Sequence, residues 1–446
     1  MCGAVIIIIM RIISLITLAA VCVFAQDGYE VPRSTDLWTY LGTFSMSEPA
    51  FVQVVTFDDD PTHEKHLLVS EFSGIPFVKG GVYLAGGIKE SIETAQIDKI
   101  SPLKIGGGFK WPNMINTVPT QVFGSRAVLV PDGFIVPTHQ TGGLYIILLD
   151  QDNNPTATHK ISKDKSSYFY HTGEWIDFNG DGKLDLLTAR TDGKKGDGQL
   201  LWFENPGQAL TSDQEWTEHL ITEGPDVLFT IQELDNDPST LEIFAGEFWN
   251  EQLTLNVVTV SGGELKQRVV IDDTIKHAYR AEVVDLNGDG KLEVVVNNHE
   301  TSTSDTAVYA FEIPADEFLD ASKYVRHTIA SEFPVQWGFT NMAPGFTNAV
   351  WPYASDKAKP GKKADFLVAG DGDYRAHLLE YKGDWEYANE VIKNENGTVG
   401  IIAIDDIDED GWNEFIVANY DKGYVEVYTF ATEARIAARE MIAMEE

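Results

Sequence analysis

Short apolar runs recur along most of the chain, and polar turns rich in Asp, Asn, Gly and Pro separate them. Residues 281–284 and 294–296, for example, are rich in valine and enclose one such acidic turn. Runs of this length and composition, bounded by turn-forming residues, predict β-strands. A helix is expected only at the C-terminal end, over residues 431–446.

The predicted strands fall into groups of four that recur about every 50 to 60 residues, about seven times. Third strands are predicted at 200–204, 308–312, 377–381 and 425–430, and fourth strands at 216–221 and 324–329. The pattern predicts an all-β fold, a seven-bladed β-propeller of four-stranded antiparallel blades with a short C-terminal helix. An open β-solenoid is the alternative, and its usually shorter repeats disfavour it. The propeller is expected to form one domain over residues 26–430.

The N-terminal segment has its own pattern. An apolar run, 12–24, follows Arg11 and ends at small residues before Gln26, which predicts a cleaved signal peptide over residues 1–25 and a secreted protein. A membrane anchor is the alternative, because residues 6–9 lengthen the apolar stretch. Both cysteines of the chain lie within 1–25, so the mature chain is expected to have no disulfide and to depend on packing and bound ions.

The formal net charge of the chain is −36 at pH 7. A surface this acidic repels nucleic acid and anionic lipid, and it attracts divalent cations. We therefore expect no nucleic-acid partner and, after signal cleavage, no membrane insertion. The sequence has no nucleophile elbow, P-loop, dinucleotide fingerprint or HExxH motif, which disfavours hydrolase and nucleotide-dependent functions.

Three of the turns share the pattern Asp-x-Asn/Asp-x-Asp-Gly-x-x-Asp/Glu. Ca²⁺ takes six to eight hard oxygen ligands at about 2.3 to 2.6 Å, and alternating acceptors in a tight loop supply them. The predicted ligands are Asp177, Asn179, Asp181, the Lys183 carbonyl and Asp185; Asp285, Asn287, Asp289, the Lys291 carbonyl and Glu293; and Asp406, Asp408, Asp410, the Trp412 carbonyl and Glu414. We expect about three structural Ca²⁺ ions. Acidic turns without an ion are the alternative, which three copies in the same strand context disfavour.

Four weaker copies of the turn are predicted at 57–61, 130–133, 234–238 and 362–365. No tight metal site is expected at two of them. The copy with Asp58 and Asp60 lacks the glycine, and the copy aligned on Asp235 is one residue short.

These turns between strands resemble the FG-GAP or VCBS repeats, a family that includes integrin α heads, fungal lectins and several carbohydrate-active propellers. Residues 201–207, followed by Trp216 and His219, are also similar to repeats in the propeller of fungal aldos-2-ulose dehydratase. The resemblance implies calcium loops and makes action on a sugar chemically credible. A shared architecture does not fix an activity.

In a four-stranded blade, the connections from first to second strand all emerge on one face of the propeller. The calcium loops are therefore expected on one face, and a ligand on the other. Candidate catalytic residues on that second face are His171, His139, Tyr279, Arg280 and His299. Candidate ligand-binding residues there are Glu71, Arg190, Glu247, Trp249, Trp337, Tyr374 and Arg375.

Aromatic rings, carboxylates and histidines at a propeller mouth fit a sugar-binding cleft. As a binding module, the protein would hold a glycan or another extracellular protein, as a monomer. As an enzyme, it would perform β-elimination or dehydration on a sugar, with His171 or His139 as base, Tyr279 as acid and Arg280 paired with a carboxylate. A soluble integrin-like interaction module is a further alternative.

Overall fold

The computed structural model describes residues 35–75, 77–136, 138–164, 167–338, 341–394 and 397–438. The contacts divide the chain into two units, and every described residue lies in the second, Arg33–Glu446. The predicted signal peptide, residues 1–25, lies outside the described residues.

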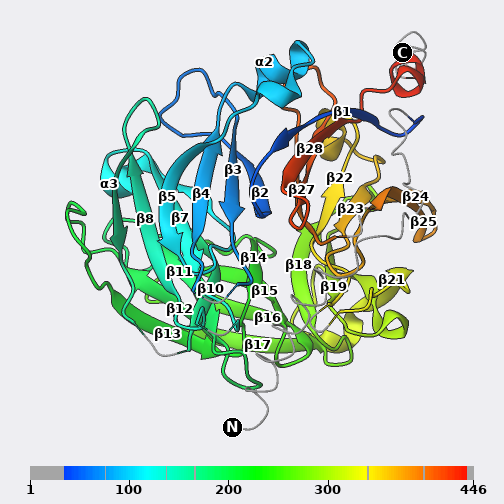
Figure 1. Cartoon of the computed structure of the whole chain (residues 1–446). Coiled ribbons are helices and arrows are strands. Elements are labelled where there is room, and N and C mark those ends of the chain that lie inside the picture. Colours follow the sequence, from blue (N-terminus) through cyan, green and yellow to red (C-terminus); the bar gives the residue numbers. More distant parts are fainter. Residues whose placement is uncertain are drawn as a thin grey trace. The chain divides into compact units, whose positions relative to one another are not determined.

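The described residues contain 28 strands in seven four-stranded antiparallel sheets (Figure 1). The predicted seven-bladed β-propeller is therefore confirmed. Blades 1 to 3 are β2 (Pro49–Val55), β3 (His66–Glu71), β4 (Gly80–Ala85), β5 (Leu103–Phe109); β6 (Asn116–Val118), β7 (Ala127–Asp132), β8 (Gly143–Leu149), β9 (Pro155–Lys160); and β10 (Phe169–Ile176), β11 (Asp185–Thr191), β12 (Gln199–Glu204), β13 (Thr217–Glu223). Blades 4 to 6 are β14 (Leu228–Gln232), β15 (Thr240–Glu247), β16 (Gln252–Thr259), β17 (Leu265–Asp272); β18 (Ala278–Val284), β19 (Glu293–Asn298), β20 (Ala307–Glu312), β21 (Val325–Ser331); and β22 (Thr347–Val350), β23 (Asp365–Ala369), β24 (Arg375–Gly383), β25 (Glu386–Asn394).

The seventh blade joins the two ends of the domain. Its first three strands are β26 (Val399–Asp405), β27 (Glu414–Asn419) and β28 (Tyr424–Thr429), and its fourth is β1 (Thr39–Ser45). β1 runs antiparallel to β28, and Figure 1 shows the two side by side. This pairing closes the ring of blades without a covalent link and covers the edge of β28.

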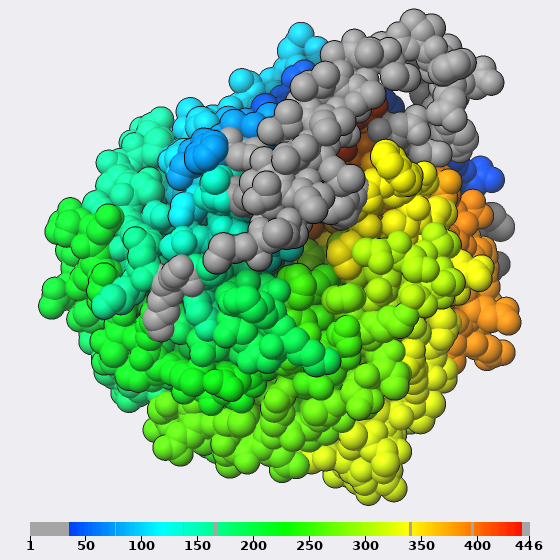
Figure 2. Space-filling view, turned by 60° about the horizontal axis from the view of Figure 1, so that its bottom comes forward, coloured from blue at the N-terminus to red at the C-terminus, as the bar shows by residue number. Residues whose placement is uncertain are grey.

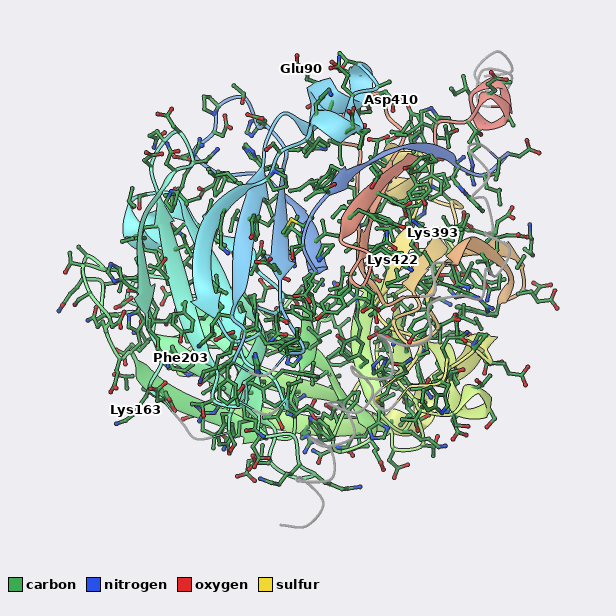
Figure 3. The ribbon with its side chains drawn as sticks, viewed as in Figure 1. Glu90, Lys163, Phe203, Lys393, Asp410 and Lys422 are labelled. Carbon is green, nitrogen blue, oxygen red and sulfur yellow. The ribbon has the colours of Figure 1, made fainter. Side chains whose placement is uncertain are left out.

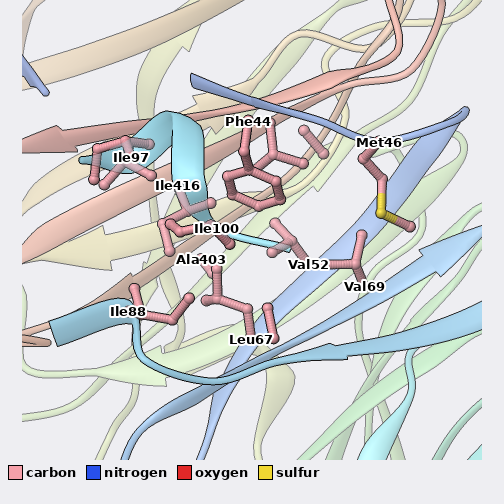
Figure 4. Close-up of a cluster of buried hydrophobic side chains, with 14 of the residues drawn as sticks. Phe44, Met46, Val52, Leu67, Val69, Ile88, Ile97, Ile100, Ala403 and Ile416 are labelled. Atoms are coloured by element: carbon pink, nitrogen blue, oxygen red, sulfur yellow. The ribbon is translucent and has the colours of Figure 1, made fainter. Parts of the chain in front are cut away.

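Apolar side chains of neighbouring blades fill the space between the sheets. The second strand of each blade has a strand on either side, and in β19 and β27 every residue is buried. At the closure, Phe44 of β1 packs with Leu67 of β3 and Ile416 of β27 in one cluster (Figure 4). The core is therefore a set of such clusters around the ring rather than one central core.

The short helices lie in the connections. They are α2 (Ile88–Glu93), η1 (Ile97–Lys99), α3 (Thr120–Phe123), η2 (Thr303–Asp305), η3 (Ala321–Lys323) and η4 (Ala354–Ala358). The expected C-terminal helix is present over the described residues 433–438. In the part of the chain that the structure describes, no helix combines the length and apolarity that crossing a bilayer requires.

One predicted turn is placed differently. Residues 130–133 were expected between the first two strands of a blade, but β7 is the second strand of blade 2 and ends at Asp132. The connection from β6 to β7 is instead 119–126 and contains α3. The first strand of this blade was not recognised in the sequence, because β6 has only three residues and is too short to show an apolar pattern.

Candidate metal loops and ligand face

The three calcium-loop sequences connect first to second strands in blades 3, 5 and 7. In the first loop, Asp177 accepts hydrogen bonds from the amides of Gly180 at 2.8 Å and Gly182 at 2.9 Å. Asn179 accepts from the Asp181 amide at 3.0 Å. These bonds turn the backbone so that the side-chain oxygens lie on one side of a tight loop.

The second and third loops repeat this arrangement. Asp285 accepts from the amides of Gly288 at 2.8 Å and Gly290 at 2.9 Å. In the third loop, Glu409 occupies the position of Gly180 and Gly288 and has the same left-handed backbone, with φ of 65°. A non-glycine residue is strained there, so the loop conformation holds against a local preference.

The last acid of each loop is buried and closes the loop. Glu414 is 0 % exposed, and its Oε2 accepts from the Ile407 amide at 2.8 Å, as Glu293 does from Leu286 at 2.8 Å. Burial, followed by the charge of Asp408, raises the pKa of Glu414 to about 8. The buried carboxylates and the loop aspartates crowd negative charge in a small volume.

Carboxylate oxygens of Asp406, Asp408 and Glu414 lie within 4.8 Å of one another. This is the spacing at which one cation can contact all three. The first two loops offer the same positions, with Asn179 and Asn287 in place of Asp408. All three loops therefore present oxygen ligands that could hold a Ca²⁺ ion.

Blade 4 contains a further loop of this kind. The sequence pattern put Asp235 at its first ligand position, and the structure places the loop differently. Glu242 accepts from the Leu234 amide at 3.1 Å, as Glu293 does from the Leu286 amide. Glu233, the residue before Leu234, therefore takes the first ligand position. The blade 4 loop is one residue longer than the three predicted calcium loops, not one residue shorter. Oxygens of Glu233, Asp235 and Glu242 lie within 4.8 Å of one another. Glu242 is 0 % exposed, and its Oε1 has no hydrogen-bond partner among the described residues.

The connections from second to third strands and between blades emerge at the other end of the propeller, which we call the ligand face. Figure 3 places Asp410 of the third loop beside Glu90 of α2, and Lys163, in the connection between blades 2 and 3, at the opposite end. Figure 2 turns that opposite end towards the viewer. By strand order, all twelve candidate catalytic and ligand-binding residues lie at or near the ligand face.

The candidate histidines of blades 2 and 3 are enclosed. His171 is 4 % exposed, and its described ring contacts are with Phe134 and Phe169. Burial lowers the pKa of His171 to about 3, so its imidazole is neutral. His139 is also buried, with Nε2 3.0 Å from the Val78 carbonyl oxygen. Both rings contribute to packing between blades.

The candidates of blade 5 form a separate group. The rings of Tyr279 and His299 stack at 5.3 Å. His299 Nδ1 lies 2.8 Å from the Pro344 carbonyl, which makes it the donor and leaves Nε2 3.7 Å from the Asp371 carboxylate. Burial raises the pKa of Asp371. The structure thus brings Tyr279 and His299 together, while His171 packs with other rings.

Arg280 faces a cavity rather than this histidine. The cavity measures about 560 Å³ and lies among the first strands of blades 1, 5, 6 and 7. The guanidinium stands 3.9 Å above the Phe346 ring and 4.0 Å from a Glu282 oxygen. Burial lowers the pKa of Arg280.

Three candidate ligand-binding residues are engaged in ion pairs within blades. Glu247 is 0 % exposed and lies 2.5 Å from Arg268, and Arg190 lies 3.0 Å from Glu218. Glu71 lies 3.5 Å from Lys104 and also accepts from the Tyr83 hydroxyl at 3.0 Å. These contacts occupy the charged groups that the sequence assigned to a ligand.

The remaining candidates are more accessible. Trp337 is 96 % exposed, and its loop is tied to the next blade by the Gln336 amide, 2.9 Å from the Gly372 carbonyl. Tyr374 and Arg375 are half-buried, and Trp249 packs edge-on against Phe248.

Apolar loop residues at the ligand face were missed by the sequence reasoning. They are Ile75, Phe77, Val78 and Ile135, all of them exposed. The Phe77 amide donates to Thr138 at 3.1 Å, which links the loops of blades 1 and 2. These residues could have been noticed in the sequence, because they are apolar residues next to Gly and Pro in connections between strands, where polar residues are usual.

No family model matches this chain, and no curated protein matches it. One similar solved structure is that of the Dos1 propeller, at 10 % sequence identity and a TM-score of 0.47, covering 89 % of this chain and 96 % of that one. The FG-GAP likeness therefore stays a resemblance, and the propeller architecture stands on the strand order of the chain itself.

Proposed function

We propose that this protein is a secreted β-propeller that is stiffened by calcium and binds a carbohydrate at its ligand face. Trp337 is the observation that supports carbohydrate binding most strongly, because an indole ring that is 96 % exposed offers a stacking platform for a sugar. Extracellular calcium suits this reading, since modules outside the cell use sites with dissociation constants of about 10⁻⁴ to 10⁻³ M.

Polar groups on the loop of Trp337 and on the loop joined to it add to the proposed sugar site, because Asn341 donates to the Gln336 carbonyl at 3.3 Å. Asn341 donates to the Tyr374 hydroxyl at 2.8 Å, and Arg375 lies 3.5 Å from Asp373. An exposed ring on loops that also carry a hydroxyl, an amide and a guanidinium would provide stacking together with hydrogen bonds to sugar hydroxyls or a uronate.

A glycan panel that includes uronate polysaccharides tests the binding proposal. We expect the protein to be retained on at least one glycan, and Trp337→Ala to weaken that binding about 30-fold, or about 2 kcal/mol. Leu220→Ala, which changes an exposed residue on β13, is the control and should bind normally. Retention on no glycan, or equal binding by both variants, contradicts the proposal.

The calcium proposal rests on the oxygen positions of the three predicted loops, with blade 4 as a fourth. A bound cation would neutralise the crowded carboxylates and hold the two strands that each loop connects. We expect chelation to lower the melting temperature, because calcium at about 10 mM, which is about 10 to 100 times such dissociation constants, stabilises the fold by about 1.4 to 2.7 kcal/mol per site.

Calorimetry with and without chelator checks this, together with metal analysis of the purified protein. Asp406→Asn, at a position that is Asp in all three predicted loops, should reduce the calcium response, while Asp316→Asn, an exposed residue outside the loops, should leave it unchanged. A melting temperature that chelator does not change, together with no calcium in the purified protein, would contradict this part of the proposal.

A second candidate is a sugar lyase, favoured by the pairing of His299 with Tyr279. In that reaction His299 Nε2 would take the C5 proton of a uronate, Tyr279 would protonate the leaving oxygen, the C4–O bond would break and a C4=C5 bond would form. Unsaturated product, followed by absorbance, should appear with wild type, disappear in His299→Gln and persist in His159→Gln. Wild type that binds glycan without forming product rules this candidate out.

A further inference from the structure

The connection between β2 and β3 in blade 1 brings together a histidine and two carboxylates. Ligand atoms of Asp60, Glu64 and His66 lie within 4.8 Å of one another. The sequence predicted no tight metal site here, because the turn lacks the glycine.

His66 occupies a special position in the blade. It is the first residue of β3 and lies opposite Val55, as Glu293 is the first of β19 and lies opposite Val284. The position that carries the last oxygen ligand of the calcium-type loops therefore carries an imidazole in blade 1.

The imidazole is buried without a hydrogen bond. His66 is 3 % exposed, and neither Nδ1 nor Nε2 has a hydrogen-bond partner among the residues described. Leaving a buried polar group unpaired costs about 1 to 3 kcal/mol. Burial lowers the pKa of His66, so the ring is in the neutral form that binds metals.

The two carboxylates each keep one oxygen turned to the histidine. Asp60 Oδ1 accepts from the Thr62 amide at 2.9 Å, and Glu64 Oε1 accepts from the Gly87 amide at 3.0 Å. Glu64 Oε2 lies 4.0 Å from His66 Nε2. Hydrogen bonds of this kind orient metal ligands and fix which oxygen remains available.

Arg126 is the positive group that faces the cluster. Its Nε lies 2.7 Å from Asp59, while its Nη2 is 3.9 Å from Asp60 Oδ2. Because the shorter contact is with Asp59, the guanidinium is held to one side and Asp60 Oδ2 remains available.

We propose that Asp60, Glu64 and His66 bind one Zn²⁺ ion. Zinc accepts one imidazole nitrogen and two carboxylate oxygens at about 2.0 to 2.2 Å, with water in a fourth position. Calcium is a poor match, because it takes oxygen ligands. Glu64 lies at the surface and provides the route of entry.

The test titrates the full chain with Zn²⁺ in the presence of excess Ca²⁺, so that the oxygen-only loops are saturated. We expect one Zn²⁺ per chain, and a loss of affinity of at least about tenfold in His66→Gln. His63→Gln changes an exposed histidine of the same loop and should bind zinc as wild type does. Replacing zinc by Co²⁺ should give visible absorption bands typical of a nitrogen ligand, absent in His66→Gln.

Glu64→Gln covers the case in which His66→Gln fails to fold, since Glu64 is exposed and its change should leave the fold intact. It should lower zinc affinity as well. No zinc binding by wild type with Ca²⁺ present, or equal affinity in wild type, His66→Gln and Glu64→Gln, overturns the proposal.

Discussion

Single buried acids tie neighbouring connections together at the ligand face. Asp226, in the connection between blades 3 and 4, is 1 % exposed and accepts from the amides of Phe248 at 2.9 Å and Trp249 at 2.7 Å. Burial, opposed by these hydrogen bonds, raises the pKa of Asp226 to about 8, and the nearby charge of Glu247 adds to the rise. Glu247 is paired with Arg268, so the guanidinium balances the negative charge of this nearby carboxylate.

Asp226→Asn should therefore flatten the pH dependence of stability. A folded-state pKa above the unfolded value of about 3.9 means that the protonated acid stabilises the fold at low pH, and that this contribution is lost as the pH rises to about 8. The variant lacks this titration. Because wild type loses this stability and the variant does not, the free energy of unfolding of the variant relative to wild type should increase by a few kcal/mol, as an order of magnitude, between pH 4 and pH 8.

Denaturant unfolding at several pH values measures this difference. Asp316→Asn, an exposed control, should follow the wild-type curve at every pH. If the Asp226→Asn and wild-type curves run parallel across the range, the acid is ionised throughout and the assigned pKa is wrong.

The places of the three acidic loops between first and second strands were predictable, because the spacing of their residues is local and repeated. The candidate site on the ligand face was harder to predict. Arg190 and Glu247 pair with Glu218 and Arg268 on other strands, and such pairings depend on strand register, which the sequence pattern does not give. His66 shows no local signal in the sequence, because its place opposite Val55 at the start of β3 also depends on strand register.

At the scale of elements, ion pairs and stacked rings connect strands at the blade edges. Histidines in the fourth strands of blades 3 and 5 each pair with a glutamate of the third strand: His219 lies 3.0 Å from Glu204, and His327 lies 2.7 Å from Glu312. His219 also stacks on Trp202 of its own blade at 4.0 Å. His327 stacks on Trp385 at 4.1 Å, on the neighbouring blade. The partners of both histidines lie on other strands and became visible only with the fold.

Lys393 of β25 and Glu426 of β28 form a buried ion pair between blades 6 and 7. They are 1 % and 5 % exposed, and Glu426 also accepts from the Tyr428 hydroxyl at 3.0 Å. Figure 3 labels Lys393. Burial lowers the pKa of Lys393. Because the pair is shielded from solvent, salt should affect it little.

Lys393→Met should destabilise the protein by about 3 to 5 kcal/mol, because it leaves the Glu426 charge buried without its cation. Adding Glu426→Gln removes that charge and should recover part of the loss. Thermal unfolding of the two variants and wild type gives the comparison. A double variant no more stable than Lys393→Met would show that the loss comes from packing instead.

At the scale of the whole molecule, the number of blades and their strand order followed from the repeat, but the closure did not. β1 pairs with β28 across almost the full length of the chain, as in Phe44 opposite Val425. No local pattern in 39–45 distinguishes a fourth strand of the last blade from a first strand of the first. Only the fit of its apolar side chains into the cluster at the junction decides between them.

Weakening this closure should open the ring rather than only lower its stability. Phe44 is 2 % exposed within the cluster at the junction, so Phe44→Ala should cost about 3 to 5 kcal/mol. Ile329→Ala, in the fourth strand of blade 5, has a similar cost, but that strand is held by covalent connections on both sides. β1 is joined covalently only to β2, so its release exposes the β28 edge while the other blades persist.

Native-state hydrogen exchange separates the two cases. In Phe44→Ala the amides of β1 and β28 should exchange faster than those of the other blades, whereas in Ile329→Ala protection should fall around blade 5 alone or evenly. Uniform loss of protection in both variants would mean that the ring unfolds as one cooperative body, and that the pair of terminal strands opens no more readily than strands joined by the chain.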